Sequence, residues 1–121
     1  MTEPATDPRF IRVTLTSIGG PLIWALHFGA VYGGQHVACR AALAGDAGIR
    51  TGIIAATIAA ILALLAVFLL ARRLVQPAPP ADPDVPAFLH SVTAWLLGLS
   101  LFAVLASGLA ALMLPSCPSL R

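Results

Sequence analysis

Three long stretches of this chain carry no Asp, Glu, Lys or Arg, and they constrain the fold more than any other feature. They cover residues 18–39, 51–71 and 87–114. A helix needs about 20 consecutive, mostly apolar residues to cross the hydrocarbon core of a bilayer, and each stretch is long enough. With 59% hydrophobic and 10% charged residues, the chain has too little polar surface for a soluble globule. The sequence therefore predicts an all-α membrane protein with three transmembrane helices.

Short polar segments separate the three stretches, and proline marks several boundaries. Pro21 is expected in the first turn of the first helix, where its missing N–H would be unpaired anyway, and Pro86 and Pro115 flank the third helix. The segment 72–86 contains the run QPAPPADPDVP, which favours an extended, stiff loop. We expect a loop over 40–50 and tails over 1–17 and 115–121. Within the first tail, the apolar and basic segment 9–13 could instead lie on the membrane surface.

The arginines indicate which way the chain crosses the membrane, since short cytoplasmic loops are enriched in basic residues. With the N-terminus inside, the cytoplasmic segments 1–17 and 72–86 hold four arginines and the periplasmic segments 40–50 and 115–121 hold three. The adjacent pair Arg72 and Arg73 directly follows the second helix. We therefore expect a cytoplasmic N-terminus and a C-terminus on the opposite side, which is the periplasm or the exterior. The net charge of +2 contains no basic run that would suggest a nucleic-acid partner.

The two cysteines lie at the ends of different helices. Cys39 ends the first stretch and Cys117 follows the third, so any path with three crossings places both on the same side of the membrane. In the expected orientation that side is the periplasm, where disulfides persist. We predict a Cys39–Cys117 disulfide between the first and third helices, with two free thiols as the alternative.

Small residues recur at intervals of four in two of the stretches. Gly29 and Gly33 form a GxxxG pattern in the first, and Ala94 and Gly98 repeat the spacing in the third. Helices associate in lipid by close packing at small residues. These four positions are therefore predicted helix-packing sites. Internal packing of the three helices is the simpler interpretation, and docking onto helices of another membrane protein is the alternative.

The histidines are the ionisable groups nearest the membrane interior, where polar side chains are costly and often functional. His27 lies in the middle of the first stretch, His36 near its end and His90 near the start of the third. A bis-histidine haem needs two imidazoles at one depth on facing helices, and these positions match poorly. His27 is thus a candidate for cofactor binding, and a hydrogen bond to a neighbouring group is the simpler interpretation.

A copper site is a second alternative at the cysteine end of the bundle. His36 and Cys39 are three residues apart and share a helix face, so with Cys117 they would supply one imidazole and two thiolates. Sulfur ligands of this kind suit Cu(I). A disulfide and a thiolate site exclude each other, and the histidine positions match a haem poorly. We therefore predict no metal and no cofactor, with copper or haem as the alternatives.

The sequence contains no recognisable catalytic motif or small-molecule site, which favours a protein that is not an enzyme.

The segment Gly20–Phe28 (GPLIWALHF), followed by Tyr32 and Cys39 and by a terminal Leu114–Cys117 (LPSC), resembles a group of small bacterial inner-membrane proteins with three spans. Many members of that group are encoded beside genes of haem–copper cytochrome c oxidases. The resemblance implies an accessory subunit or assembly helper of such a respiratory complex, whose partners are the lipid bilayer and other membrane-protein subunits. Handling of copper or haem on the periplasmic face, or a separate helix bundle with a role in the envelope, are the alternatives.

Overall fold

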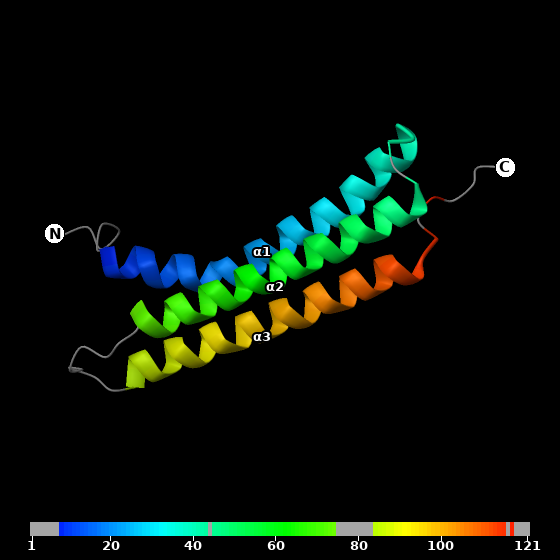
Figure 1. Ribbon diagram of the computed structural model, residues 1–121. Coiled ribbons are helices and arrows are strands. Elements are labelled where there is room, and N and C mark those ends of the chain that lie inside the picture. Colours follow the sequence, from blue (N-terminus) through cyan, green and yellow to red (C-terminus); the bar gives the residue numbers. More distant parts are fainter. Residues whose placement is uncertain (1–7, 44, 75–83, 116, 118–121) are drawn as a thin grey trace.

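The computed structural model describes residues 8–43, 45–74, 84–115 and 117, and within these ranges it contains three α-helices and no strand. The helices are α1 (Pro8–Arg40), α2 (Asp46–Leu74) and α3 (Asp84–Met113), and they lie side by side along their lengths (Figure 1). Each contains a segment long and apolar enough to cross a membrane, namely Ile11–Arg40, Asp46–Arg73 and Ala87–Met113. The predicted all-α fold with three membrane spans is confirmed.

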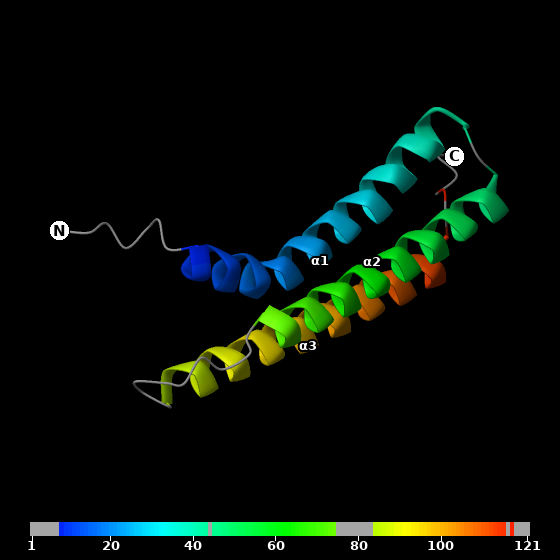
Figure 2. The same cartoon turned by 60° about the vertical axis from the view of Figure 1, so that its left-hand side comes forward.

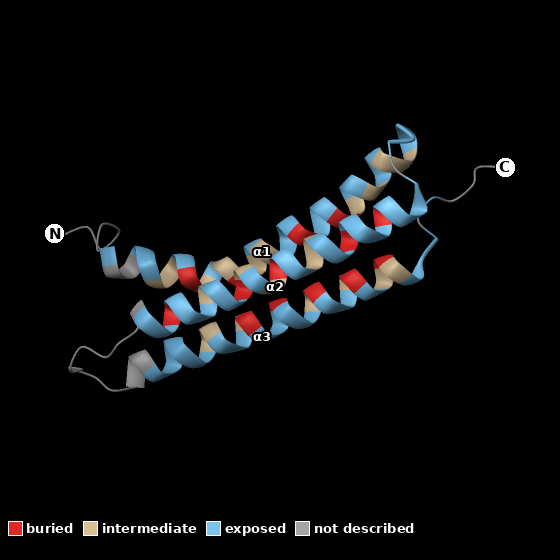
Figure 3. Cartoon of the chain, in the orientation of Figure 1, coloured by how far each residue is buried: buried red, intermediate tan, exposed pale blue. Residues whose placement is uncertain are grey.

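Helices α1 and α3 run in the same direction, and α2 runs in the opposite direction to both (Figure 1). Two clusters of buried side chains hold them together. One cluster lies in the middle of the bundle around Leu64, Leu97 and the fully buried Val104. The other lies toward the end where α1 meets α2, around Val31 and Ile53. Most of the remaining large apolar residues are exposed, as expected where the surrounding solvent is lipid. Figure 3 shows exposed residues along all three helices.

Helix α1 begins at Pro8 rather than at residue 18, so residues 8–17 are helical and the predicted tail is wrong for this segment. Residues 1–7 lie outside the described part of the chain. Pro21 consequently lies inside the helix and not at its start. Because proline has no N–H to bond the carbonyl of Ser17, a bend is expected here. Figure 2 shows α1 changing direction between its blue N-terminal part and its cyan C-terminal part.

The link between α1 and α2 is shorter than predicted, because α1 continues to Arg40 and α2 begins at Asp46. The amide of Leu43 bonds the carbonyl of Ala38, and Ala42 has a φ of 48°. This is a Schellman-type cap in which alanine occupies the left-handed position that usually holds glycine. The end of α1 therefore cannot be located from the sequence by looking for a glycine.

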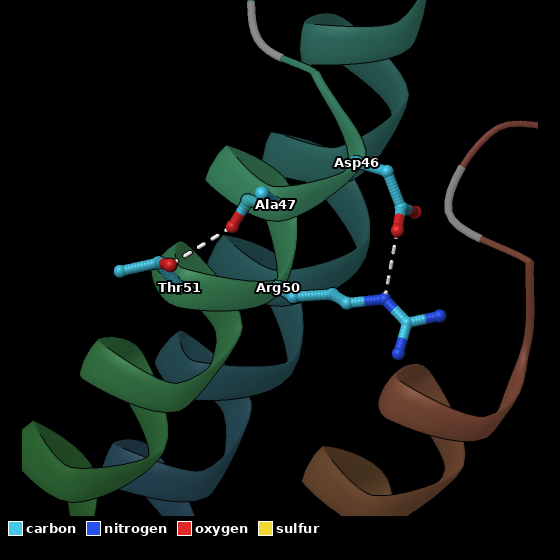
Figure 4. A network of polar contacts seen from close by, with 4 residues as sticks. All are labelled: Asp46, Ala47, Arg50 and Thr51. Atoms are coloured by element: carbon cyan, nitrogen blue, oxygen red, sulfur yellow. Dashed lines mark hydrogen bonds and ion pairs between the residues drawn. The ribbon is translucent and has the colours of Figure 1, made fainter.

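The first turns of α2 are stabilised by polar contacts along its own surface (Figure 4). Asp46 accepts from the Arg50 guanidinium at 3.0 Å, and the Thr51 hydroxyl donates to the Ala47 carbonyl at 2.8 Å. A carboxylate in the first turn also interacts favourably with the positive end of the helix dipole. These contacts explain why α2 starts earlier than its apolar stretch.

At its other end α2 reaches Leu74, and α3 starts at Asp84. The proline-rich segment 75–83 lies outside the described residues.

Candidate functional site

A polar cluster lies at the point where all three helices meet. His27 on α1, which the sequence places near the middle of its span, is only 4% exposed. Its Nε2 lies 3.1 Å from the Thr57 hydroxyl on α2, and its Nδ1 lies 3.4 Å from the Ser107 hydroxyl on α3. One imidazole thus contacts both neighbouring helices, and we call His27, Thr57 and Ser107 the histidine cluster.

The two hydroxyls of the histidine cluster also bond their own helices. The Thr57 hydroxyl donates to the Ile53 carbonyl at 2.8 Å, and the Ser107 hydroxyl donates to the Ala103 carbonyl at 2.8 Å. A neutral imidazole has one donor and one acceptor nitrogen, whereas a hydroxyl can donate and accept. While both hydroxyls donate to their own helices they can only accept from the ring, so a neutral imidazole donates to one of them at a time, and the other bonds the second ring nitrogen only by turning its hydrogen away from its own carbonyl. Among the described residues, no buried side-chain nitrogen or oxygen lacks a hydrogen-bond partner.

Two glycines allow the helices to approach closely enough for these contacts. A Cβ atom on Gly108 would lie 2.8 Å from the Thr57 hydroxyl oxygen, and a Cβ atom on Gly20 would lie 2.9 Å from the Ser100 hydroxyl oxygen. Neither distance leaves room for a side chain. Gly108 thus sets the α2–α3 distance beside His27, and Gly20 sets the α1–α3 distance.

Helix α3 presents a row of hydroxyls toward α1. Thr93, Ser100 and Ser107 recur at every seventh residue. Thr93 lies 3.1 Å from the Ser17 hydroxyl, Ser100 faces Gly20, and Ser107 faces His27. A seven-residue spacing keeps side chains on one seam between parallel helices that pack together. We call this row and its α1 partners the hydroxyl seam.

The predicted packing residues lie on the opposite surface. Gly29, Gly33, Ala94 and Gly98 are all exposed, and a Cβ atom added to any of the three glycines would meet no other atom within 4 Å. Their interpretation as internal packing sites is therefore wrong. A four-residue spacing shows that small residues share one face of a helix, but it does not show whether that face is turned toward the bundle or away from it. In this bundle the hydroxyl and imidazole side chains lie on the inward face. The alternative, docking onto another protein's helices, stays open for these positions.

The predicted disulfide is confirmed: Cys39 and Cys117 are bonded, with their Cα atoms 5.6 Å apart. Both sulfurs of the alternative copper site are therefore bonded to each other, and His36 is exposed. Within the described ranges, no three His, Cys, Asp or Glu side chains are grouped so that they could hold a metal ion. His90 is exposed near the start of α3, whereas His27 is buried between two hydroxyls.

Sequence reasoning identified His27 and the cysteines but missed Thr57, Ser107 and Gly108. One available signal was the seven-residue recurrence of Thr93, Ser100 and Ser107, which indicates a polar seam in an otherwise apolar helix. No comparable signal marks Thr57, because it is an isolated hydroxyl in an alanine-rich stretch.

Comparison of the chain with protein-family models, with curated proteins and with solved structures finds no match.

Proposed function

We propose that this chain is a non-enzymatic accessory subunit or assembly helper of a bacterial respiratory complex, namely a haem–copper cytochrome c oxidase. The resemblance carried by the segment 20–28, Tyr32, Cys39 and the terminal LPSC motif supports the identity of the partner. The arrangement of the three helices supports a role in docking. The proposal places the chain in the inner membrane, with its N-terminus in the cytoplasm and the disulfide in the periplasm.

The observation that carries the docking role is the outward position of the small-residue pairs. Gly29 and Gly33 form an open stripe on α1, and Ala94 and Gly98 form another on α3. In lipid, such stripes are where helices of different subunits can approach closely. Because the internal contacts of the bundle use other residues, these stripes remain accessible to a partner. The proposed function is therefore recognition of neighbouring transmembrane helices.

The histidine cluster supports this proposal as the element that keeps the two stripes in a fixed relation. His27 contacts both α2 and α3, so it ties the α1 stripe to the α3 stripe through the interior of the bundle. A bundle whose helices are joined by a polar cluster inside and that carries small-residue stripes outside suits a small subunit that lies against a larger complex. In this proposal the cluster has a structural role, and its residues transform no substrate.

Purification of the full chain from bacterial membranes in a mild detergent tests the proposal. We expect subunits of the oxidase to co-purify with the tagged chain, and deletion of its gene to lower oxidase activity in isolated membranes. A chain that purifies without any oxidase subunit, and whose deletion leaves oxidase activity unchanged, would contradict the proposal.

A variant with Gly29→Leu and Gly33→Leu separates docking from folding. Bulky side chains on the outward stripe should lower the recovery of the partner while the disulfide and the helix content remain intact. Ala66→Leu is the control, since Ala66 is also an exposed small residue, on α2. Equal loss of the partner in both variants would show that the α1 stripe is not the docking surface.

A further inference from the structure

The disulfide joins the last turn of α1 to the segment that follows α3, at the end of the bundle where α1 turns into α2 (Figures 1 and 2). Cys117 is exposed, and Cys39 is half-buried against the apolar cluster around Val31 and Ile53. A thiolate reagent outside the membrane can therefore reach the bond through Cys117. The accessibility of a disulfide is one of the factors that control its exchange with other thiols.

Besides the disulfide, the packing of Ala38 and Cys39 against the apolar cluster holds the last turns of α1, and several other residues of these turns have open surroundings. Neither Gly33 nor Gly34 has a neighbouring atom within 4 Å of where its Cβ would be, and His36 and Val37 are exposed. Glycine inside a helix also costs about 1 kcal/mol relative to alanine. The covalent bond at Cys39 is thus the strongest connection between this end of α1 and the rest of the bundle.

A groove between α1 and α2 begins next to this bond. It has a volume of about 230 Å³ and is lined mainly by small residues of the two helices. The small residues are Ala30, Gly34 and Ala38 on α1 and Gly48, Gly52 and Ala56 on α2. Ala38 directly precedes Cys39, so a movement of the end of α1 changes the width of the groove.

We propose that the Cys39–Cys117 bond is a redox latch, which fixes the last turns of α1 and thereby the width of the α1–α2 groove. The reductant is an external dithiol. Its thiolate attacks the sulfur of Cys117, the more exposed residue of the pair, forms a mixed disulfide and releases the Cys39 thiolate. The second thiol of the reagent then displaces Cys117. The protein gains two electrons and two protons as a pair of thiols, and the reagent becomes a disulfide. This inference does not depend on the partner proposed above.

Distances between spin labels across the groove test the latch directly. Labels attached through unnatural amino acids at Val37 and Thr51, both exposed, are insensitive to the reductant. The full chain in lipid nanodiscs is measured before and after treatment with dithiothreitol. We expect the distance distribution to broaden and shift to longer values on reduction. An unchanged distribution after complete reduction overturns the proposal.

Hydrogen exchange of the backbone amides distinguishes a local latch from a general loss of stability. We expect amides of residues 35–41 to exchange about tenfold faster after reduction, with residues 53–60 and 100–107 unchanged. The variant C39S/C117S, without reductant, should match the reduced chain. If that variant does not fold, the reduced wild-type chain still decides the outcome. Exchange that does not change, or that rises equally in all three helices, overturns the proposal.

Discussion

The inward and outward faces of α1 and α3 use the same kind of residue in opposite ways. On the inward face, Gly20 and Gly108 lie so close to hydroxyls of neighbouring helices that no Cβ fits. On the outward face, Gly29, Gly33 and Gly98 have open space around them. The glycines that hold this bundle together are those opposite Ser100 and Thr57. What separates the two groups is a close neighbour on the next helix, and not the spacing along their own helix; Gly19, whose Cβ would lie 3.3 Å from the Val67 side chain, shows that this neighbour can also be apolar.

The largest effect is expected from Gly108→Leu. The new side chain would overlap with Thr57, push α2 away from α3 and separate Thr57 from His27. Forcing extra volume into a packed interior costs about 1–3 kcal/mol. Unfolding of the detergent-solubilised chain should report this loss of stability, whereas Gly98→Leu on the outward face of the same helix should not lower the stability. Similar stability losses in both variants would show that the two faces do not differ.

The second largest effect is expected from His27→Leu, which removes both interhelical contacts of the imidazole. Interhelical hydrogen bonds in membranes contribute about 0.6 kcal/mol on average and up to about 1.7 kcal/mol. Thr57 and Ser107 keep their bonds to their own helices, so the change leaves no hydroxyl unpaired. We expect a loss of stability within that range. His36→Leu, at an exposed position, is the control and should have little effect on the unfolding transition.

The fold was predictable from sequence because the bilayer imposes a simple rule. Three uncharged apolar stretches are expected to become three helices, and three crossings place Cys39 and Cys117 on the same side of the membrane, where they can pair. The helix ends were less predictable. Residues 8–17 extend α1 although they include polar residues, with Pro8 in the first position, where its missing N–H costs nothing, and Ala42 caps that helix in place of a glycine.

The candidate site was only partly predictable, because it depends on how the helices are rotated about their axes. The sequence identifies His27 as an unusual residue but does not show which hydroxyls it meets. An alanine-rich helix has small residues on every side, so its pattern does not define an inward face. The rotation is set by pairs that are far apart in sequence, such as Ser17 with Thr93 and Thr57 with Gly108.

A third prediction uses the same substitution on both faces of α1. Gly29→Ala should raise the stability of the bundle by about 0.5–1 kcal/mol, since alanine favours a helix and no atom opposes the new methyl group. Gly20→Ala should lower the stability, because its Cβ would displace the Ser100 hydroxyl from the Leu96 carbonyl that it now bonds at 2.7 Å. Thermal unfolding of both variants in the same detergent measures whether each substitution raises or lowers the stability. A stabilising effect at both positions would contradict the close packing at Gly20.

The smallest effect is expected at the start of the hydroxyl seam, where Ser17 and Thr93 share one hydrogen bond of 3.1 Å. Both side chains are half-buried, and neither carries charge. A double-mutant cycle with Ser17→Ala and Thr93→Ala should give a coupling energy of about 0.6 kcal/mol, the average for interhelical pairs in a membrane. Ser17→Ala combined with Ser107→Ala is the control, because those two residues belong to separate contacts along the seam and their effects should add. If the control pair couples as strongly as the contact pair, the seam acts as one cooperative unit rather than as a row of independent contacts.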